Sequence, residues 1–154
     1  MEIRRIMVIG AGFMGSGIAQ VMAAAGYEVV LRDVAEECIT KGMSAVAKNL
    51  AGHVAKGKLS EVDREAILGR IHPTTELASA KKCDLIIEAI IENKQAKLDL
   101  FRQLEELCPP HVIFASNTSS IPITELATAT KRPDKFAGMH FFSPVPVMKL
   151  VEII

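Results

Sequence analysis

The sequence contains no tryptophan, one tyrosine and no excess of charge, because its eighteen basic and eighteen acidic residues cancel. A chain without net charge has no overall basic field to attract a polyanion, so we expect neither nucleic acid nor a membrane as a partner. No apolar run reaches the roughly 18 residues that a membrane-spanning helix needs. The three cysteines, Cys38, Cys83 and Cys108, form no Cys-x-x-Cys pair, which predicts buried or half-buried thiols in a reducing, cytoplasmic compartment. No spacing of histidines, cysteines and carboxylates predicts a metal site.

The sequence is instead rich in short apolar runs that alternate with amphipathic segments. This alternation predicts an α/β fold with a mostly parallel sheet, a helical insertion after the second strand and a C-terminal antiparallel hairpin. No linker or repeat divides the chain, so we expect one domain over residues 1–154. Strands are predicted over 3–9, 27–33, 70–76, 83–90, 112–117, 136–142 and 148–154, and helices over 13–26, 36–56, 60–68, 92–108 and 122–128.

The first loop has the spacing G-x-G-x-x-G, in the order Gly10, Ala11, Gly12, Phe13, Met14 and Gly15. Alone this spacing is a weak signal, but here it follows a predicted strand, opens a predicted helix and precedes an acidic residue at the end of the next strand. In this context Gly10 allows a tight turn, Gly12 lets a pyrophosphate approach the backbone, and Gly15 lets helix and strand pack closely. Free N–H groups at the helix start would bind the phosphates. The pattern predicts a dinucleotide site in a Rossmann-type, doubly wound sheet.

The acidic residue at the end of the second strand is Asp33, which is expected to accept hydrogen bonds from the adenosine ribose. A 2′-phosphate would meet its like charge, so NAD is predicted over NADP. Arg32 would favour a phosphate, but its side chain should point to the opposite face of the strand. The alternative is that the glycines only turn the chain and Asp33 only caps a helix.

His140 and Glu152 lie twelve residues apart, around a turn that contains two prolines. In an antiparallel hairpin centred on Pro146, the two side chains fall opposite each other with Cβ atoms about 5 Å apart. The carboxylate would then fix the imidazole tautomer through Nδ1–H and leave Nε2 free to take a proton. Beside a nicotinamide, such a base removes the hydroxyl proton of an alcohol whose carbon gives up hydride. The alternative is a structural salt bridge near a strand end.

Other polar residues follow the predicted strands at their carboxyl ends, where open α/β sheets bind ligands. Ser116 to Ser120 follow one strand, and Glu88 and Glu92 follow another. The hydroxyl groups are expected to hydrogen-bond a substrate oxygen or to cap the helix that begins near Pro122. Ser120 is the residue expected to cap it.

The chain resembles the NAD-binding half of the 3-hydroxyacyl-CoA dehydrogenases in the segments "IGAGFMGSGIAQ", "RD", "EAIIENKQAKLDLF", "FASNTSSIPI" and "GMHFFSPVPVMKLVEII". Among these enzymes, the bacterial 3-hydroxybutyryl-CoA dehydrogenases are the nearest match. The resemblance covers the whole chain, and its last segment is far more specific than the glycine motif. It implies NAD-dependent oxidation of a short-chain (S)-3-hydroxyacyl-CoA to the 3-oxoacyl-CoA, or the reverse, as in fatty acid metabolism. It makes His140 the general base, Glu152 its orienting partner, and Ser119 the hydroxyl that contacts the substrate oxygen and the nicotinamide region.

The resemblance also implies contacts to the cofactor and to coenzyme A. It places Glu92 and Lys97 near the cofactor. Where the family commonly has Asn, this chain has Ser143, a shorter side chain for the same cofactor contact. Lys56 and Lys58 are candidates for binding the phosphates of coenzyme A, with a solvated charged surface as the alternative.

Members of the family continue into a helical C-terminal domain, which supplies a catalytic Asn, closes over the acyl-CoA and forms the dimer. This domain is expected to be absent from residues 1–154, which leaves two main functional hypotheses. The first is a dehydrogenase domain that is weakly active alone or active with a partner chain. The second is a non-catalytic NAD-binding module that self-associates or binds a partner through the face left by the absent domain. A third is a reductase of another small carbonyl compound.

Overall fold

A seven-stranded sheet with the strand order β3-β2-β1-β4-β5-β6-β7 runs through the computed structural model, which describes residues 1–154. The first six strands are parallel, and β7 is antiparallel to β6. The order reverses between β1 and β4, which is the Rossmann-type arrangement predicted from the sequence. The strands are β1 Arg5–Ile9, β2 Glu28–Arg32, β3 Ile71–Thr74, β4 Leu85–Glu88, β5 Ile113–Ser116, β6 Phe136–Phe141 and β7 Val151–Ile153.

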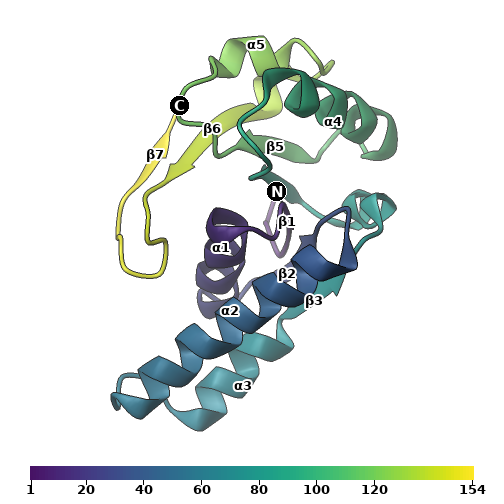
Figure 1. Cartoon of the computed structure of the whole chain (residues 1–154). Coiled ribbons are helices and arrows are strands. Elements are labelled where there is room, and N and C mark those ends of the chain that lie inside the picture. Colours follow the sequence, from purple (N-terminus) through teal and green to yellow (C-terminus); the bar gives the residue numbers. More distant parts are fainter.

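Helices cover both faces of the sheet, with α1, α2 and α3 on one side and α4 and α5 on the other (Figure 1). The predicted insertion after the second strand is the pair α2 and α3. None of the helices is both long and apolar enough to cross a bilayer. The helices are α1 Phe13–Ala24, α2 Glu36–Ala55, α3 Glu61–Gly69, α4 Lys94–Leu107 and α5 Ile123–Ala127, with 3₁₀ turns η1 Leu77–Lys82 and η2 Pro133–Lys135.

The continuous apolar runs of β1 and β4 follow from helical cover on both faces. Along β1, Ile6 and Val8 pack into the core on the α1 side, while Met7 and Ile9 pack into the core on the α4 side. Successive side chains of a strand point to opposite faces, so such a strand needs an apolar residue at every position. The edge strand β3 pairs only with β2 and contains Pro73, which an edge strand tolerates because it needs no ladder hydrogen bond on its outer side.

The starts of α3 and α5 differ in how they are capped. Ser60 caps α3, because its hydroxyl accepts the N–H of Asp63 at 3.0 Å. Ser120 does not cap α5, so that expectation was wrong: Pro122 precedes the helix and no side chain caps it. The N–H of Ile121 instead donates to the hydroxyl of Thr118 at 3.1 Å.

The last strand is shorter than the predicted range 148–154. Before β7, the chain forms a turn in which the N–H groups of Val147 and Met148 both donate to the carbonyl of Pro144, each at 3.0 Å. The strand therefore begins at Val151 rather than Met148, and its pairing with β6 extends to Ile154, which exchanges two main-chain hydrogen bonds with Gly138.

The cysteines are all free, and two of them are buried in the core. Burial raises the pKa of Cys83 and of Cys108 to about 11 in each case. Cys38 is exposed on α2, which contradicts the expectation that all three thiols are at least half-buried. It falls on the outer side of a helix whose buried stripe passes through Ile39.

Arg132 joins the end of α4 to the start of β5, near the amino ends of the strands. Its guanidinium forms two bonds with the carboxylate of Glu105, with Nε at 2.8 Å from Oε2. The remaining N–H groups donate to the carbonyls of Cys108, Pro109 and Val112. All the donors of this buried side chain are therefore satisfied.

Candidate active site

The carboxyl ends of the parallel strands form one continuous edge of the sheet. In the strand register, Ile9 pairs with both Arg32 and Glu88, and Glu88 pairs with Ser116. The loops that follow these strands are therefore neighbours, although they are far apart in sequence. They carry the glycine motif, Asp33, Glu92 and Ser119, while His140 lies one residue before the end of β6.

The glycine motif forms the turn between β1 and α1. Gly10 has a φ of 108°, and a Cβ there would lie 2.4 Å from the carbonyl oxygen of Ala89. A Cβ on Gly15 would lie 1.6 Å from the carbonyl oxygen of Gly10, so α1 packs directly on the turn. A Cβ on Gly12 would meet nothing within 4 Å. The backbone is therefore crowded within the protein at Gly10 and Gly15 but open at Gly12, as a site for an approaching pyrophosphate requires.

The start of α1 is free to bind an anion. Gly12 is the N-cap, no side chain caps the helix, and no acidic residue lies in its first turn. The first N–H groups of a helix have no partner within it, and they carry a partial positive charge. Phe13 is largely exposed and Met14 is half-buried beside these groups. These features fit the phosphates of a dinucleotide.

Asp33 connects the end of β2 to the glycine loop. Its Oδ2 accepts the N–H of Ala11 at 2.8 Å, and its Oδ1 accepts the N–H of Val34 at 2.7 Å. The half-buried carboxylate is thus fixed beside the loop that would hold the pyrophosphate. The neighbouring Arg32 donates from Nε to the carbonyl of Thr75 at 3.1 Å, beyond the end of β3. Arg32 therefore has a partner at the sheet edge.

A buried polar cluster lies at the ends of β4 and β5. Glu88, Lys97 and Ser116 are all at most 1% exposed. Glu88 Oε2 lies 2.5 Å from Lys97 Nζ, and Glu88 Oε1 accepts the Ser116 hydroxyl at 2.6 Å. A buried charge is tolerated when it is paired and hydrogen-bonded, and both conditions hold here. Lys97, expected near the cofactor, is therefore covered and bound to Glu88.

Glu92 connects this cluster to the loop after β5. It accepts the hydroxyl of Thr118 and lies 3.9 Å from Lys97 Nζ. Its side chain is 44% exposed, so it reaches the surface of the crevice while it contacts the buried lysine. Ser119, the next residue after Thr118, is exposed at the same edge.

His140 and Glu152 are directly opposite in the β6–β7 register, as predicted from a hairpin centred on Pro146. Nδ1 of His140 lies 3.3 Å from Oε1 of Glu152. The imidazole also packs against the ring of Phe142, with the centroids 4.6 Å apart. The histidine side chain is 23% exposed, so a ligand can reach it while its orientation is restricted.

Asn117 was not singled out from the sequence, but it connects the end of β4 to the end of β6. Its side-chain oxygen accepts the N–H of Phe141 at 2.9 Å, and its own N–H donates to the carbonyl of Glu88 at 2.9 Å. The strand that carries His140 is thus held to the loop that carries Ser119. An amide residue placed directly after a buried strand was the available signal.

Three predicted residues lie outside this cluster of side chains. Ser143 is exposed in the turn after β6, before a cis peptide bond to Pro144. Lys56 and Lys58 are exposed at the tip of the α2–α3 pair, which projects from the rest of the molecule (Figure 1). Between this pair and the β6–β7 turn lies a groove of about 100 Å³, lined by residues of α1, α2 and the turn 144–146.

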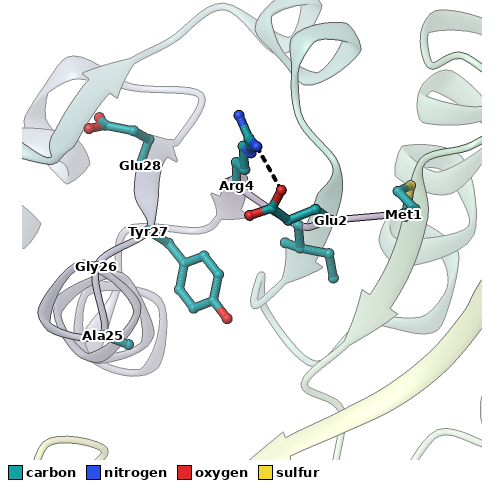
Figure 2. Close-up of a pocket in the computed structure, with 8 residues that line it drawn as sticks. Met1, Glu2, Arg4, Ala25, Gly26, Tyr27 and Glu28 are labelled. Carbon is teal, nitrogen blue, oxygen red and sulfur yellow. Dashed lines mark hydrogen bonds and ion pairs between the residues drawn. The ribbon is translucent and has the colours of Figure 1, made fainter.

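A larger hollow, of about 760 Å³, lies at the opposite edge of the sheet. Figure 2 shows it between the start of the chain, the end of α1 and the start of β2, with Tyr27 and an Arg4–Glu2 ion pair at its wall. None of the predicted site residues lines it. It lies at the amino ends of the strands, where parallel sheets do not hold their ligands.

Comparisons with known proteins agree with this geometry. Residues 5–154 match the family model of the 3-hydroxyacyl-CoA dehydrogenase NAD-binding domain. A probable 3-hydroxybutyryl-CoA dehydrogenase of Bacillus subtilis is 51% identical over the whole chain, which spans 54% of that relative. The solved 3-hydroxybutyryl-CoA dehydrogenase of Escherichia coli is 42% identical with a TM-score of 0.97, over 99% of this chain and 32% of that one. The (S)-3-hydroxybutyryl-CoA dehydrogenase of Ralstonia eutropha is 45% identical with a TM-score of 0.96, over 99% of this chain and 54% of that one.

The chain therefore spans about half the length of the first curated relatives that it matches. The matching domain is an NAD-binding domain, and the open glycine turn, the free helix start and Asp33 all fit that cofactor. The chain belongs to the 3-hydroxyacyl-CoA dehydrogenase family, in which it corresponds to the domain that binds NAD.

Proposed function

We propose that this chain binds NAD and supplies the general base for the oxidation of an (S)-3-hydroxyacyl-CoA to the 3-oxoacyl-CoA, or the reverse. The observation that carries the proposal is the His140–Glu152 pair at the sheet edge that also carries the glycine turn. The names of the relatives, which are 3-hydroxybutyryl-CoA dehydrogenases, support a short-chain substrate.

His140 has the arrangement that a general base needs. With Nδ1–H donated to Glu152, the lone pair on Nε2 is free to accept the hydroxyl proton of the substrate. The imidazolium that forms is then stabilised by the adjacent carboxylate. Bound NAD would supply the hydride acceptor for the substrate carbon that bears this hydroxyl. In the reverse direction, Nε2–H returns the proton to the substrate oxygen.

Ser119 is proposed to donate a hydrogen bond to the substrate oxygen, because its exposed hydroxyl lies in the loop that Asn117 joins to β6. Glu92 and Ser143 are proposed cofactor contacts at the crevice surface. For Lys97, burial against Glu88 supports a role in holding Glu92 in place rather than an open phosphate contact.

Coenzyme A is proposed to follow the groove between α1, α2 and the turn 144–146 toward the tip of α2. Gln20 and Asn49, bonded to each other at 2.7 Å, provide polar groups along the groove. Lys56 lies two helical turns beyond Asn49, and Lys58 follows in the next turn of the chain. Their exposed ammonium groups would pair with the phosphates of the coenzyme.

A second candidate function is a non-catalytic NAD-binding module that self-associates or acts with a partner chain. The observation that favours it is a set of exposed apolar side chains between the β6–β7 turn and the residue after β7. They are Val147, Met148, Leu150, Ile153 and Ile154. These five side chains lie within residues 147–154, and exposed apolar side chains gathered in a patch mark interaction sites. Such a module needs the glycine turn and Asp33 but has no use for His140.

The two functions are distinguished by changing His140 to Ala and following NADH oxidation by acetoacetyl-CoA. General-base catalysis contributes about 10²- to 10⁴-fold, so turnover should fall by that factor. The NADH affinity, measured by fluorescence titration, should stay within about twofold, because the histidine acts on the substrate. His111→Ala, an exposed histidine at the opposite edge of the sheet, is the matched control and should change neither quantity.

Each outcome decides between the functions. Turnover that disappears only in the His140 variant supports the dehydrogenase. If NADH affinity falls as far as turnover, His140 is structural and the proposed mechanism is wrong. If the unaltered chain binds NADH without any turnover, the second candidate function is supported.

A further inference from the structure

Glu88 is a fully buried carboxylate whose bonds extend into the two loops after β4 and β5. Its Oε2 accepts Lys97 Nζ at 2.5 Å and the N–H of Ile90 at 2.8 Å. Its Oε1 accepts the hydroxyl of Ser116 at 2.6 Å, and its main-chain carbonyl accepts the N–H of Asn117 at 2.9 Å. One residue thus fixes the start of both loops.

The contacts continue from Ser116 to both sides of Ser119. The Ser116 oxygen accepts the N–H of Thr118 at 3.2 Å. The Thr118 hydroxyl oxygen in turn lies 3.4 Å from the N–H of Ser120, which donates to it. The residues before and after Ser119 are therefore anchored through their backbone, and the chain of contacts begins at Glu88.

Glu88 also determines which carboxylate Lys97 binds. The ammonium lies 2.5 Å from Glu88 but 3.9 Å from Glu92, which accepts the Thr118 hydroxyl. If Glu88 lost its charge, the buried cation would have Glu92 as its remaining carboxylate. Attraction between opposite charges is strong at a buried site, so Lys97 would draw Glu92 away from Thr118.

We infer that Glu88 is a positioning residue, which holds the loop of Ser119 in the geometry that the nicotinamide half of the cofactor and the substrate oxygen require. The inference rests on the proposed function, because it uses the placement of Ser119 beside the nicotinamide. At the adenosine end, the carboxylate of Asp33 is bonded to Ala11 and Val34 and to no residue of this network, which reaches the glycine turn only where the Ala89–Ile90 peptide packs on Gly10. Glu88 should therefore affect the nicotinamide end far more than the adenosine end.

This selectivity is tested by titrating NADH and ADP-ribose, which lacks the nicotinamide, into the chain and into its Glu88→Gln variant. The loss of one buried hydrogen-bonded charge should weaken NADH binding about tenfold. ADP-ribose binding should stay within about twofold. Ser116→Ala, which removes only the hydroxyl that transmits the contact, should weaken NADH about threefold, and it decides the question if the Glu88 variant does not fold.

The matched control is Glu105→Gln, which breaks the other well-buried ion pair, with Arg132, near the opposite edge of the sheet. It should lower the melting temperature without changing either affinity. If the Glu88 variant loses equal affinity for NADH and for ADP-ribose, Glu88 has only a structural role. If it loses no affinity for NADH, Glu88 has no role in binding. Either result would overturn this inference but not the proposed function. An unaltered chain that fails to bind NADH at all would overturn the cofactor site and the inference together.

Discussion

Alanine substitutions at three glycines should separate the two demands that a nucleotide turn makes on its backbone, which are close packing within the protein and open access for the ligand. Gly15→Ala would put a Cβ 1.6 Å from the carbonyl oxygen of Gly10, so α1 would have to move away from β1 by well over an ångström. Overpacking of this kind typically costs about 1–3 kcal/mol, and the severity of this contact points to about 3 kcal/mol. For a domain of this size, that is a fall in melting temperature of about 6–12 °C.

Gly12→Ala should behave differently, because its Cβ would meet no protein atom within 4 Å and its φ of −74° suits alanine. The free energy of unfolding should stay within about 0.5 kcal/mol. The methyl group would, however, occupy the space through which the pyrophosphate approaches, so NADH affinity should fall at least about tenfold. Gly15→Ala should lose NADH binding as well as stability.

The control is Gly52→Ala, in the interior of α2, where an added Cβ again meets nothing within 4 Å. Replacing an interior helical glycine should raise stability by about 0.5–1 kcal/mol and leave NADH affinity unchanged. Urea denaturation gives the stability, and fluorescence titration gives the affinity. A Gly12 variant that binds NADH as well as the unaltered chain would refute the assignment of the pyrophosphate to this turn.

Three further changes test other parts of the structure. Arg132→Met leaves the Glu105 carboxylate and the carbonyls of Cys108 and Val112 without their side-chain partner, so urea denaturation should show a loss of about 3–5 kcal/mol in the free energy of unfolding; a loss below about 1 kcal/mol would contradict the reasoning. Two backbone N–H groups at the start of β1 lower the pKa of Asp84 below its ordinary value of 3.8, so its contribution is present above that pH and is lost as the pH falls through the lower, folded-state value. Asp84→Asn should therefore make the free energy of unfolding less dependent on pH in this acidic range. An unchanged slope of that free energy against pH would mean that Asp84 does not cause the dependence. Asp33→Asn should weaken NADH binding about tenfold and reduce the ratio of NADH affinity to NADPH affinity, as measured by titration of both nucleotides. If that ratio is unchanged, Asp33 does not face the ribose.

The elements of the fold were predictable because they depend on local patterns. Continuous apolar runs identified β1 and β4, since a strand covered on both faces needs an apolar residue at every position. The pairing of His140 with Glu152 followed from counting residues from Pro146, because a hairpin fixes its register by its turn.

The buried ion pair at the site could not be predicted in the same way. Lys97 lies near the start of the predicted helix 92–108, where four of the five preceding residues are polar, and a lysine in such surroundings is expected to face solvent. It is buried because Glu88, nine residues earlier on another element, provides a charge partner, and that depends on how α4 packs against β4. The same limit applies to Ser120: α5 begins only at Ile123 with Pro122 as its N-cap, so Ser120 lies two residues too early to cap it.

The uneven exposure of the three thiols makes the natural sequence suitable for single-site labelling. Cys38 is exposed in the first turn of α2, only a few residues after Asp33, whereas Cys83 and Cys108 are buried and stay protonated at neutral pH. A maleimide fluorophore should therefore attach at one position, five residues after Asp33, which is the residue proposed to bind the adenosine ribose. Its emission would report the arrival of a nucleotide, or of a second polypeptide over the crevice, without any engineered cysteine.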